Sequence, residues 1–286
     1  MTEGGGARGG QDAEGDFHDR ILAQLQRALA EERLPARVRL QQALRLLAKY
    51  RSVLVSNTLV HQLGKEVQGG PFKGMTFLEA AREGCTAPKL LGSYESELHP
   101  HIRGAIRRGY DRVVNIGSAE GYYAVGLACA LPEAEVRAYD IDEKAQAACR
   151  ELAELNGVAA RVKTAGAFRG ADFDALAAEP GRSLVLCDIE GAERELLDPA
   201  RFPGLLSLDL IVELHEVAEQ GLSKEVTGRF QDSHEVVIVP HGLPREPLPF
   251  LLQGLDNLDR LLAVWEWRSG PTPWAVMLAK ESAEGA

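Results

Sequence analysis

The chain lacks clustered positive charge, a long apolar run and an N-terminal apolar segment, and each absence excludes a class of protein. Its 286 residues carry 32 Lys and Arg against 42 Asp and Glu, which gives a formal net charge of −10. Nucleic-acid binding depends mainly on clustered basic side chains, so we expect no nucleic-acid partner. No stretch approaches the roughly 18 consecutive apolar residues of a membrane span, and the first residues do not resemble a secretory signal. We therefore expect a cytoplasmic protein without a membrane partner.

The chain also lacks paired cysteines. Its four cysteines are scattered, and none forms a C-x-x-C pair. This pattern favours reduced, mostly buried thiols over a disulfide framework or a zinc site. The four are Cys85, Cys129, Cys149 and Cys187.

Composition and periodicity divide the chain into three parts. Residues 1–16 are rich in glycine and polar residues, which predicts a disordered tail. In residues 17–100, leucines recur at helical spacing before and after Pro35, which predicts two amphipathic helices in a cap or lid region. These helices are expected to pack on the main domain, and a lid or a homodimer contact is the alternative. Residues 101–286 are predicted to form the main domain.

Strand-like and helix-like segments alternate in the main domain. This rhythm predicts an α/β fold, a Rossmann-like and mostly parallel sheet built from βαβ units with right-handed crossovers. The last segments break the rhythm and predict an antiparallel C-terminal edge strand. The predicted strands are 112–116, 135–139, 161–164, 183–187, 210–214, 234–239 and 274–278, and the predicted helices are 122–131, 143–155 and 249–262.

A glycine turn follows the first predicted strand of this domain. Gly117 permits a sharp turn and a close ligand approach, and Gly121 lies near the start of the next helix, where free N–H groups attract electronegative atoms. Asp140 comes 23 residues after Gly117, at the end of the second strand. An acidic residue about 20 residues after the turn binds ribose hydroxyls in nucleotide-binding α/β folds. Ala119 stands where G-x-G-x-x-G would have its second glycine, which disfavours a dinucleotide ligand. The structural alternative is a turn whose glycine is needed only for packing.

Acidic residues and a histidine follow two further strands. Asp188 and Glu190 come directly after strand 183–187, and Glu213, His215 and Glu216 end strand 210–214. Ligands of open parallel sheets bind beyond the carboxyl ends of the strands. These side chains are therefore expected at the same edge as the glycine turn and Asp140.

The segments N-I-G-S-A-E-G-Y-Y, C-D-I-E-G-A-E and I-V-E-L-H-E together resemble class I S-adenosylmethionine-dependent methyltransferases, most closely the FkbM-like group. The resemblance covers about residues 110–216 and implies a methyltransferase with S-adenosylmethionine as cofactor. It implies that Asp140 holds the ribose hydroxyls and that Asp188 lies beside the methionine part or the acceptor. Asn115 stands where the family usually has an acidic residue. The expected cofactor-binding residues are Asn115, Gly117, Ser118, Gly121, Tyr122, Asp140, Ile141 and Asp188.

Methyl transfer to a hydroxyl needs alignment of the reactants and often a base. We predict His215 as this base, with Asp188 and Glu190 as further catalytic residues and Glu213 on the same strand face as His215. A divalent metal such as Mg²⁺, held by Asp188, Glu190, Glu213 and His215, is the alternative. The structural alternative for His215 is a strand-end histidine that hydrogen-bonds to the backbone. The structural alternative for Glu190 and Glu193 is a pair of solvated acids that cap the next helix.

The acceptor is expected to be a small molecule, a sugar or a natural product with a hydroxyl group, as the family resemblance implies. Tyr94 and Glu95 are expected in a loop over the crevice, and a helix N-cap at Ser93 is the alternative. An NAD(P)-dependent oxidoreductase and a non-catalytic cofactor-binding module are the competing functions. The acceptor pocket is predicted from the N-terminal helices, residues 69–98 and residues 240–273, with His241, Trp265, Trp267 and Trp274 as candidate lining residues or as core.

Overall fold

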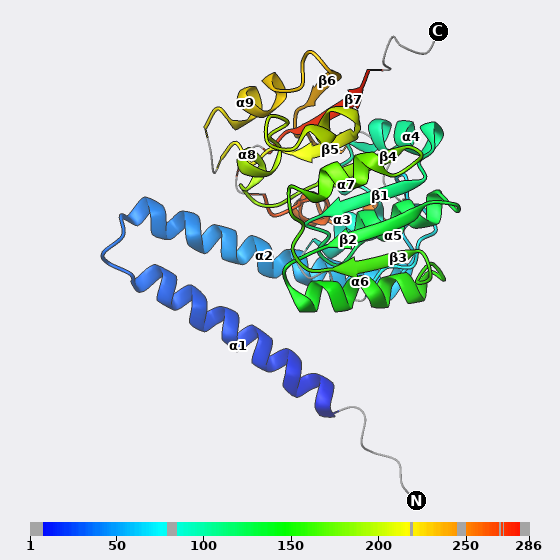
Figure 1. Cartoon of the computed structure of the whole chain (residues 1–286). Coiled ribbons are helices and arrows are strands. Elements are labelled where there is room, and N and C mark those ends of the chain that lie inside the picture. The colour runs from blue at the N-terminus through cyan, green and yellow to red at the C-terminus, as the bar shows by residue number, and fades with distance from the viewer. Residues whose placement is uncertain are drawn as a thin grey trace, which may run out of the picture.

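A seven-stranded sheet forms the centre of the computed structural model (Figure 1). The structure describes residues 8–78, 85–217, 220–244, 250–268, 270 and 272–280. Within these ranges, no helix has both the length and the apolar character that a membrane crossing requires.

The strand order is β3-β2-β1-β4-β5-β7-β6. The strands from β3 through β5 are parallel, and β7 runs antiparallel to both β5 and β6. This confirms the predicted Rossmann-like, mostly parallel sheet; the reversed strand β7 lies one position inside the edge, which β6 occupies. The strands are β1 (Arg112–Ile116), β2 (Glu135–Tyr139), β3 (Val162–Ala165), β4 (Ser183–Cys187), β5 (Asp209–Glu213), β6 (His234–Val239) and β7 (Trp274–Ala279).

The central strands are buried on both faces, as their uninterrupted apolar sequences require. Successive side chains of β1 alternate between two cores: Val113 packs with helices α4, α5 and α6, and Val114 packs with α7 and α9. The sheet therefore lies between two helical layers, which leaves only its strand ends open to ligands. The helices are α3 (Thr86–Leu91), α4 (His99–Arg108), α5 (Tyr122–Ala130), α6 (Glu143–Leu155), α7 (Asp172–Ala178), α8 (Glu193–Leu196), α9 (Leu222–Gly228) and α10 (Asn257–Ala263), with 3-10 turns η1 (Pro203–Ser207) and η2 (Phe250–Gly254).

One predicted helix is wrong in its extent. Residues 249–262 do not form a single helix, because η2 ends at Gly254 and α10 begins at Asn257. Asp256 stands between them with an extended backbone, and its carboxylate accepts a hydrogen bond from the Asp259 N–H at 2.8 Å. An aspartate that caps a new helix in this way ends the preceding one. Residue 249 lies outside the described part.

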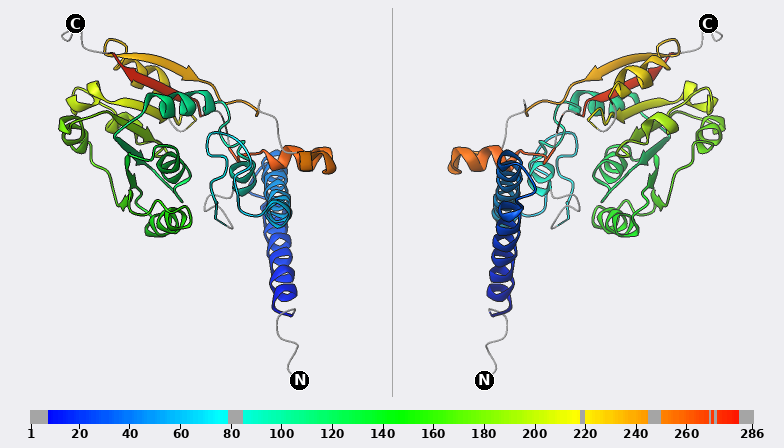
Figure 2. Two further views of the ribbon diagram at one scale, coloured as in Figure 1. Left: turned by 90° about the vertical axis from the view of Figure 1, so that its right-hand side faces the viewer. Right: turned by 90° about the vertical axis from the view of Figure 1, so that its left-hand side faces the viewer.

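Two N-terminal helices form an antiparallel arm that projects from the sheet domain (Figures 1 and 2). Helix α1 spans Arg8–Ala30 and helix α2 spans Ala36–Leu63, on either side of Pro35 as the leucine spacing predicted. The predicted disordered tail of residues 1–16 is therefore too long, because α1 begins at Arg8. Residues 1–7 lie outside the described part.

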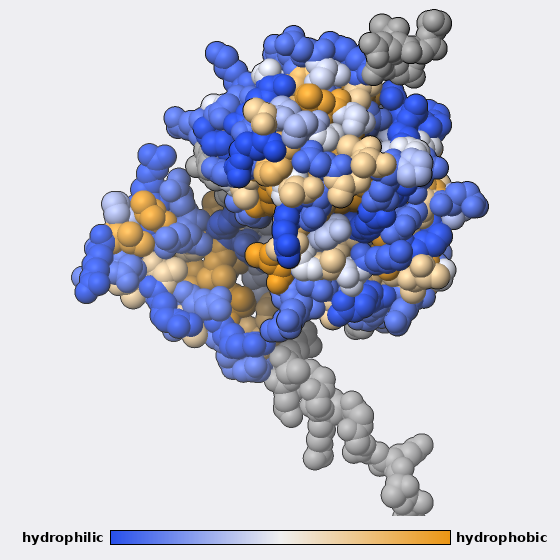
Figure 3. All heavy atoms as spheres, in the orientation of Figure 1, coloured by the Kyte–Doolittle hydropathy of each residue, from blue (hydrophilic) through white to orange (hydrophobic). Residues whose placement is uncertain are grey.

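The arm is anchored at one end. Val55 and Leu59 of α2 pack in a small core with α3 and α10, whereas α1 packs against α2. The free part exposes apolar side chains, visible as orange spheres on the arm in Figure 3. These exposed side chains are Leu22, Leu29, Leu40, Leu44 and Leu47.

Candidate functional site

The glycine turn joins β1 to α5 and lies against the end of β4. Gly117 has φ +74°, and a Cβ at this position would lie 1.6 Å from the carbonyl oxygen of Asp188. Gly121 has φ +90°, and its Cβ would lie 2.6 Å from Sγ of Cys149 in α6. Both positions therefore require glycine. Gly117 borders the site itself, whereas the close approach at Gly121 is to a neighbouring helix.

The carboxylate of Asp140 is fixed at the end of β2. The Ala119 N–H donates to its Oδ2 and the Asp142 N–H donates to its Oδ1, each at 2.8 Å. A carboxylate oxygen accepts more than one hydrogen bond, so both oxygens retain capacity for hydroxyl donors. The N–H of Ala119, the residue that interrupts the dinucleotide motif, is thus used to orient the acid.

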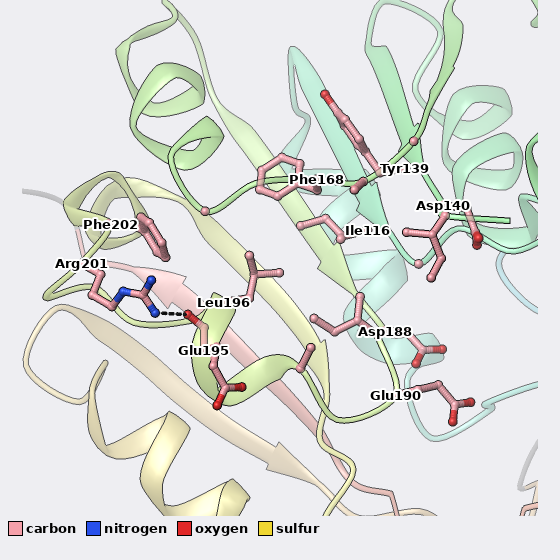
Figure 4. Close-up of a pocket in the computed structure, with 17 residues that line it drawn as sticks. Ile116, Tyr139, Asp140, Phe168, Asp188, Glu190, Glu195, Leu196, Arg201 and Phe202 are labelled. Atoms are coloured by element: carbon pink, nitrogen blue, oxygen red, sulfur yellow. Dashed lines mark hydrogen bonds between the residues drawn. The ribbon is translucent and has the colours of Figure 1, made fainter. Parts of the chain in front are cut away.

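A cavity of about 560 Å³ opens beside this carboxylate (Figure 4). Ile141 borders it with 84% of its surface exposed, which is unusual for a large apolar side chain next to a cavity. Phe168, in the loop after β3, also borders it together with Tyr139, and their ring centroids lie 5.0 Å apart. This outer cavity is therefore largely apolar, with acidic groups at its mouth. It is lined by Ile116, Gly117, Tyr139, Asp140, Ile141, Gly166, Ala167, Phe168, Gly170, Asp188, Ile189, Glu190, Ala192, Glu195, Leu196, Arg201 and Phe202.

A smaller inner cavity of about 20 Å³ adjoins the glycine turn, and Gly117 and Asp188 border both cavities. Ser118 Oγ and Tyr122 OH are buried beside it without a hydrogen-bond partner among the described residues. Burial, with a further contribution from the charge of Glu95, raises the pKa of Tyr122, so its hydroxyl is protonated and can donate. Buried orphan groups of this kind are the ones that a polar ligand would satisfy.

Three further polar residues line the inner cavity, of which the sequence indicated only Asn115. Asn115, expected from the sequence, is buried in β1 and its amide donates to the Leu186 carbonyl at 3.5 Å. Lys89 and Glu120 form a buried ion pair that the sequence did not indicate, because α3 and the glycine turn are far apart in the chain.

His215, at the end of β5, lies among three carboxylates. Its Nδ1 is 2.6 Å from Oε1 of the fully buried Glu193, while its Nε2 is 3.5 Å from Asp188 Oδ1 and 3.6 Å from Glu213 Oε2. The reading of His215 as satisfied by the backbone is therefore wrong, as is that of Glu193 as a solvated acid. Burial disfavours a charged imidazole, but the bond to Glu193 and the charge of Glu213 outweigh it and raise the pKa of His215.

Two other acids of these strand ends lie elsewhere. Glu190 is exposed with φ +57° and borders the outer cavity. Glu216 points away from His215, as strand alternation predicted, and accepts hydrogen bonds from the N–H groups of Gly221 and Ser223 at the start of α9.

Arg268, which the sequence did not indicate, contacts Oε1 of Glu213, whereas Oε2 is the oxygen near His215. Its guanidinium contacts Glu213 and Glu95 and lies 3.0 Å from Glu266 Oε2. Burial opposes ionisation of Glu213, but the charge of Arg268 outweighs it and lowers the pKa of Glu213. Burial raises the pKa of Glu95 to about 8, although Arg268 acts in the opposite direction.

The loop before α4 does close over the inner cavity. Tyr94 borders this cavity and packs edge-on against Tyr122, with ring centroids 5.5 Å apart. Ser93 is not a helix N-cap, because α4 begins at His99 and Ser93 Oγ donates to the Pro88 carbonyl instead.

The aromatic residues suggested for an acceptor pocket have other partners. Trp274 is fully buried in the core, and the rings of Trp265 and Trp267 are covered by Arg45 and Lys49 of α2. His241 Nδ1 lies 2.8 Å from Glu97 Oε1. None of these four residues lines the outer or the inner cavity.

No protein-family model matches this chain, and no curated protein matches it. Several solved structures are similar to it. An O-methyltransferase from Bacillus cereus in complex with SAH shares 14% identity over 82% of this chain and 90% of its own, with a TM-score of 0.41. The O-methyltransferase TomG from Streptomyces achromogenes, in complex with SAM, shares 14% identity over 79% and 89%, with a TM-score of 0.39. An SAH-bound methyltransferase from Podospora anserina shares 17% identity over 63% and 76%, with a TM-score of 0.41. At these levels of likeness, any function must be argued from the site of this chain itself.

Proposed function

We propose that this protein is an S-adenosylmethionine-dependent methyltransferase that methylates a hydroxyl group on a small molecule, a sugar or a natural product. The observation that carries the proposal is the pairing of the fixed Asp140 carboxylate with the exposed Ile141 at the mouth of the outer cavity. A carboxylate that accepts from two ribose hydroxyls, next to an apolar side chain that covers a base, is what an adenosine requires.

The outer cavity has room for the cofactor. Its volume is about 560 Å³, and Phe168 and Ile141 border the part that would take the adenosine. The inner cavity of about 20 Å³ has room for about one water molecule, and it borders the buried Ser118 Oγ and the protonated Tyr122 hydroxyl. When bound, the cofactor supplies an electrophilic methyl group on a sulfonium. Asp188 borders both cavities, so it lies at the inner end of the space that would take the cofactor.

The residues of this chain would act by positioning and by charge. Asp188 and Glu190 border the outer cavity, whereas His215 lines neither cavity and reaches the site only through Asp188, whose Oδ1 lies 3.5 Å from its Nε2. Because Glu193 occupies Nδ1 of His215, the ring turns its Nε2 toward Asp188 and Glu213. Assignment to the FkbM-like group rests on the D-I-E-G-A-E segment at the end of β4.

Calorimetric titration of S-adenosylhomocysteine into Asp140→Ala tests the proposal. Two lost hydrogen bonds to a charged group, at about 1.5 kcal/mol each, predict an affinity about 100-fold weaker than wild type. Glu143→Ala, an exposed acid three residues further along, is the control and should bind as wild type does. Wild-type affinity in Asp140→Ala would contradict the assignment of that carboxylate.

Two competing functions are separated by the same assay. Binding of NADH in place of S-adenosylhomocysteine would favour an oxidoreductase. Tight S-adenosylhomocysteine binding without methyl transfer to any hydroxyl acceptor would favour a non-catalytic module.

A further inference from the structure

We propose that Asp188, Glu213 and His215 bind a divalent metal cation at the carboxyl ends of β4 and β5. One ligand atom from each of the three lies within 4.8 Å of the others. Asp188 belongs to the turn after β4, and Glu213 and His215 lie two residues apart at the end of β5, so neighbouring strands bring them together.

The distances from His215 to the two acids are longer than those of a hydrogen bond. His215 Nε2 lies 3.5 Å from Asp188 Oδ1 and 3.6 Å from Glu213 Oε2, and both distances exceed the about 2.7–3.2 Å of an N–H···O hydrogen bond. Two atoms that coordinate one cation at about 2.0–2.2 Å stand about 2.8–3.6 Å apart. The distances from His215 to each acid are therefore compatible with ligands of one cation, and one ligand atom of each of the three residues lies within 4.8 Å of the others.

Each of the two buried ligands is held by an outer partner. Glu193 is fully buried, and its Oε1 lies 2.6 Å from Nδ1 of His215. With the Nδ1 proton donated to Glu193, the lone pair of Nε2 faces Asp188 and Glu213. Arg268 holds Oε1 of Glu213 and leaves Oε2 on the side of His215. Histidine ligands whose second nitrogen bonds a carboxylate, and ligating carboxylates that are themselves hydrogen-bonded, are the usual surroundings of a metal in proteins.

The local charge also calls for a cation. Three carboxylates lie close to His215, and the guanidinium of Arg268 contacts one of them, Glu213. Buried carboxylates in excess are costly unless they are paired with a cation or coordinate a metal. The three carboxylates are Asp188, Glu193 and Glu213.

The mixed ligand set indicates the type of cation. One imidazole nitrogen with two carboxylate oxygens suits a first-row divalent ion such as Mn²⁺ or Zn²⁺. The exposed Glu190 lies outside the converging group, so the ligand set differs from the one that the sequence indicated. Because a cation would use the Nε2 lone pair, His215 would act as a ligand rather than as a free base.

The site deepens the proposed methyltransferase function and rests on it for its role. Asp188, the most accessible ligand, borders both cavities. The remaining coordination positions would therefore face the acceptor. A cation there binds and acidifies a hydroxyl, which indicates an acceptor with two neighbouring oxygens, such as a vicinal diol or a hydroxy acid.

The test is Mn²⁺ binding to the full chain after treatment with EDTA and dialysis, followed by calorimetry and electron paramagnetic resonance. We expect one Mn²⁺ site per chain, with affinity lost in Glu213→Gln and His215→Gln. Glu193→Gln should weaken binding about 10- to 100-fold, as the loss of an outer partner does. Glu190→Gln, an exposed neighbour outside the group, is the matched control and should bind as wild type does. Circular dichroism establishes that each variant is folded.

Failure to bind Mn²⁺ and, in a parallel titration, Zn²⁺ would overturn the metal site, and so would equal affinity in folded Glu213→Gln and His215→Gln. Titration of S-adenosylhomocysteine into the same samples keeps the two proposals apart. Binding of S-adenosylhomocysteine without binding of Mn²⁺ would support the methyltransferase proposal and refute the metal site. Binding of Mn²⁺ without binding of S-adenosylhomocysteine would support the metal site and refute the methyltransferase proposal.

Discussion

Truncation of Ile141 to alanine separates a ligand-binding role from a structural one. The side chain is 84% exposed at the mouth of the outer cavity, so it contributes little to the folded core. Its position directly after Asp140 places it against the base of any adenosine whose ribose that carboxylate holds. Ile141→Ala is therefore expected to weaken cofactor binding while leaving the stability of the protein nearly unchanged.

The magnitude follows from the carbon atoms removed. Ile141→Ala deletes three carbon groups, which would be worth about 2.4 kcal/mol at about 0.8 kcal/mol each if the ligand buried them fully. A bound base covers one side of the side chain, so about half of this value, roughly 1.2 kcal/mol, is expected. This corresponds to an affinity about 5- to 10-fold weaker. The unfolding free energy should change by less than about 0.5 kcal/mol, as for other exposed positions.

Isothermal titration calorimetry with S-adenosylhomocysteine measures the first effect, and thermal unfolding without ligand measures the second. Leu155→Ala removes another exposed apolar side chain, 50% accessible at the end of α6, and should leave the affinity unchanged. Two results would refute the reasoning: wild-type affinity in Ile141→Ala, or an equal loss of affinity in Leu155→Ala.

Two further predictions concern stability. Gly117→Ala should lower the unfolding temperature far more than Gly157→Ala. Both glycines have positive φ, but of the two only Gly117 has a neighbour that an added Cβ would meet, the Asp188 carbonyl oxygen at 1.6 Å. Similar shifts of the two variants on thermal denaturation would argue against that clash. The hydrogen bond from Glu97 raises the pKa of His241, so its stabilisation is complete below the unfolded value of about 6.5 and fades as the pH rises through the raised pKa. Glu97→Gln should therefore lower the unfolding temperature more at about pH 5.5 than at about pH 9, and a pH-independent difference would exclude this linkage.

The sheet and the edge of the site could be predicted from the sequence because both depend on local patterns. Unbroken apolar runs at β1, β4 and β5 placed the central strands within about one residue. The strand ends then brought Asp140, Asp188 and His215 to one edge, because parallel strands point the same way. Asp188 and His215 do lie together there, and Asp140 borders the same cavity as Asp188.

The partners of these residues could not be predicted. Glu193 has the sequence signature of an acid in the first turn of a helix, and nothing in its spacing shows that the turn carries it under the ring of His215. Arg268 comes from a tail without periodicity, and its role depends on how the chain returns to β7. Phe168 is the missed residue with a usable signal, because it follows β3 at the edge where ligands were expected.

The absent side chain of Gly117 has a consequence for how such a protein can change. The carbonyl of Asp188 fills the space that a Cβ would need, so the first turn and the end of β4 move as one piece. Substitutions that re-aim Asp188 would disturb the proposed adenosine pocket at the same time, so under the proposed function a change of acceptor through this residue would also lower the affinity for the cofactor. Substitutions in the walls that lack this contact carry no such penalty, for example at Leu196 at the end of α8 and at Phe202 before η1.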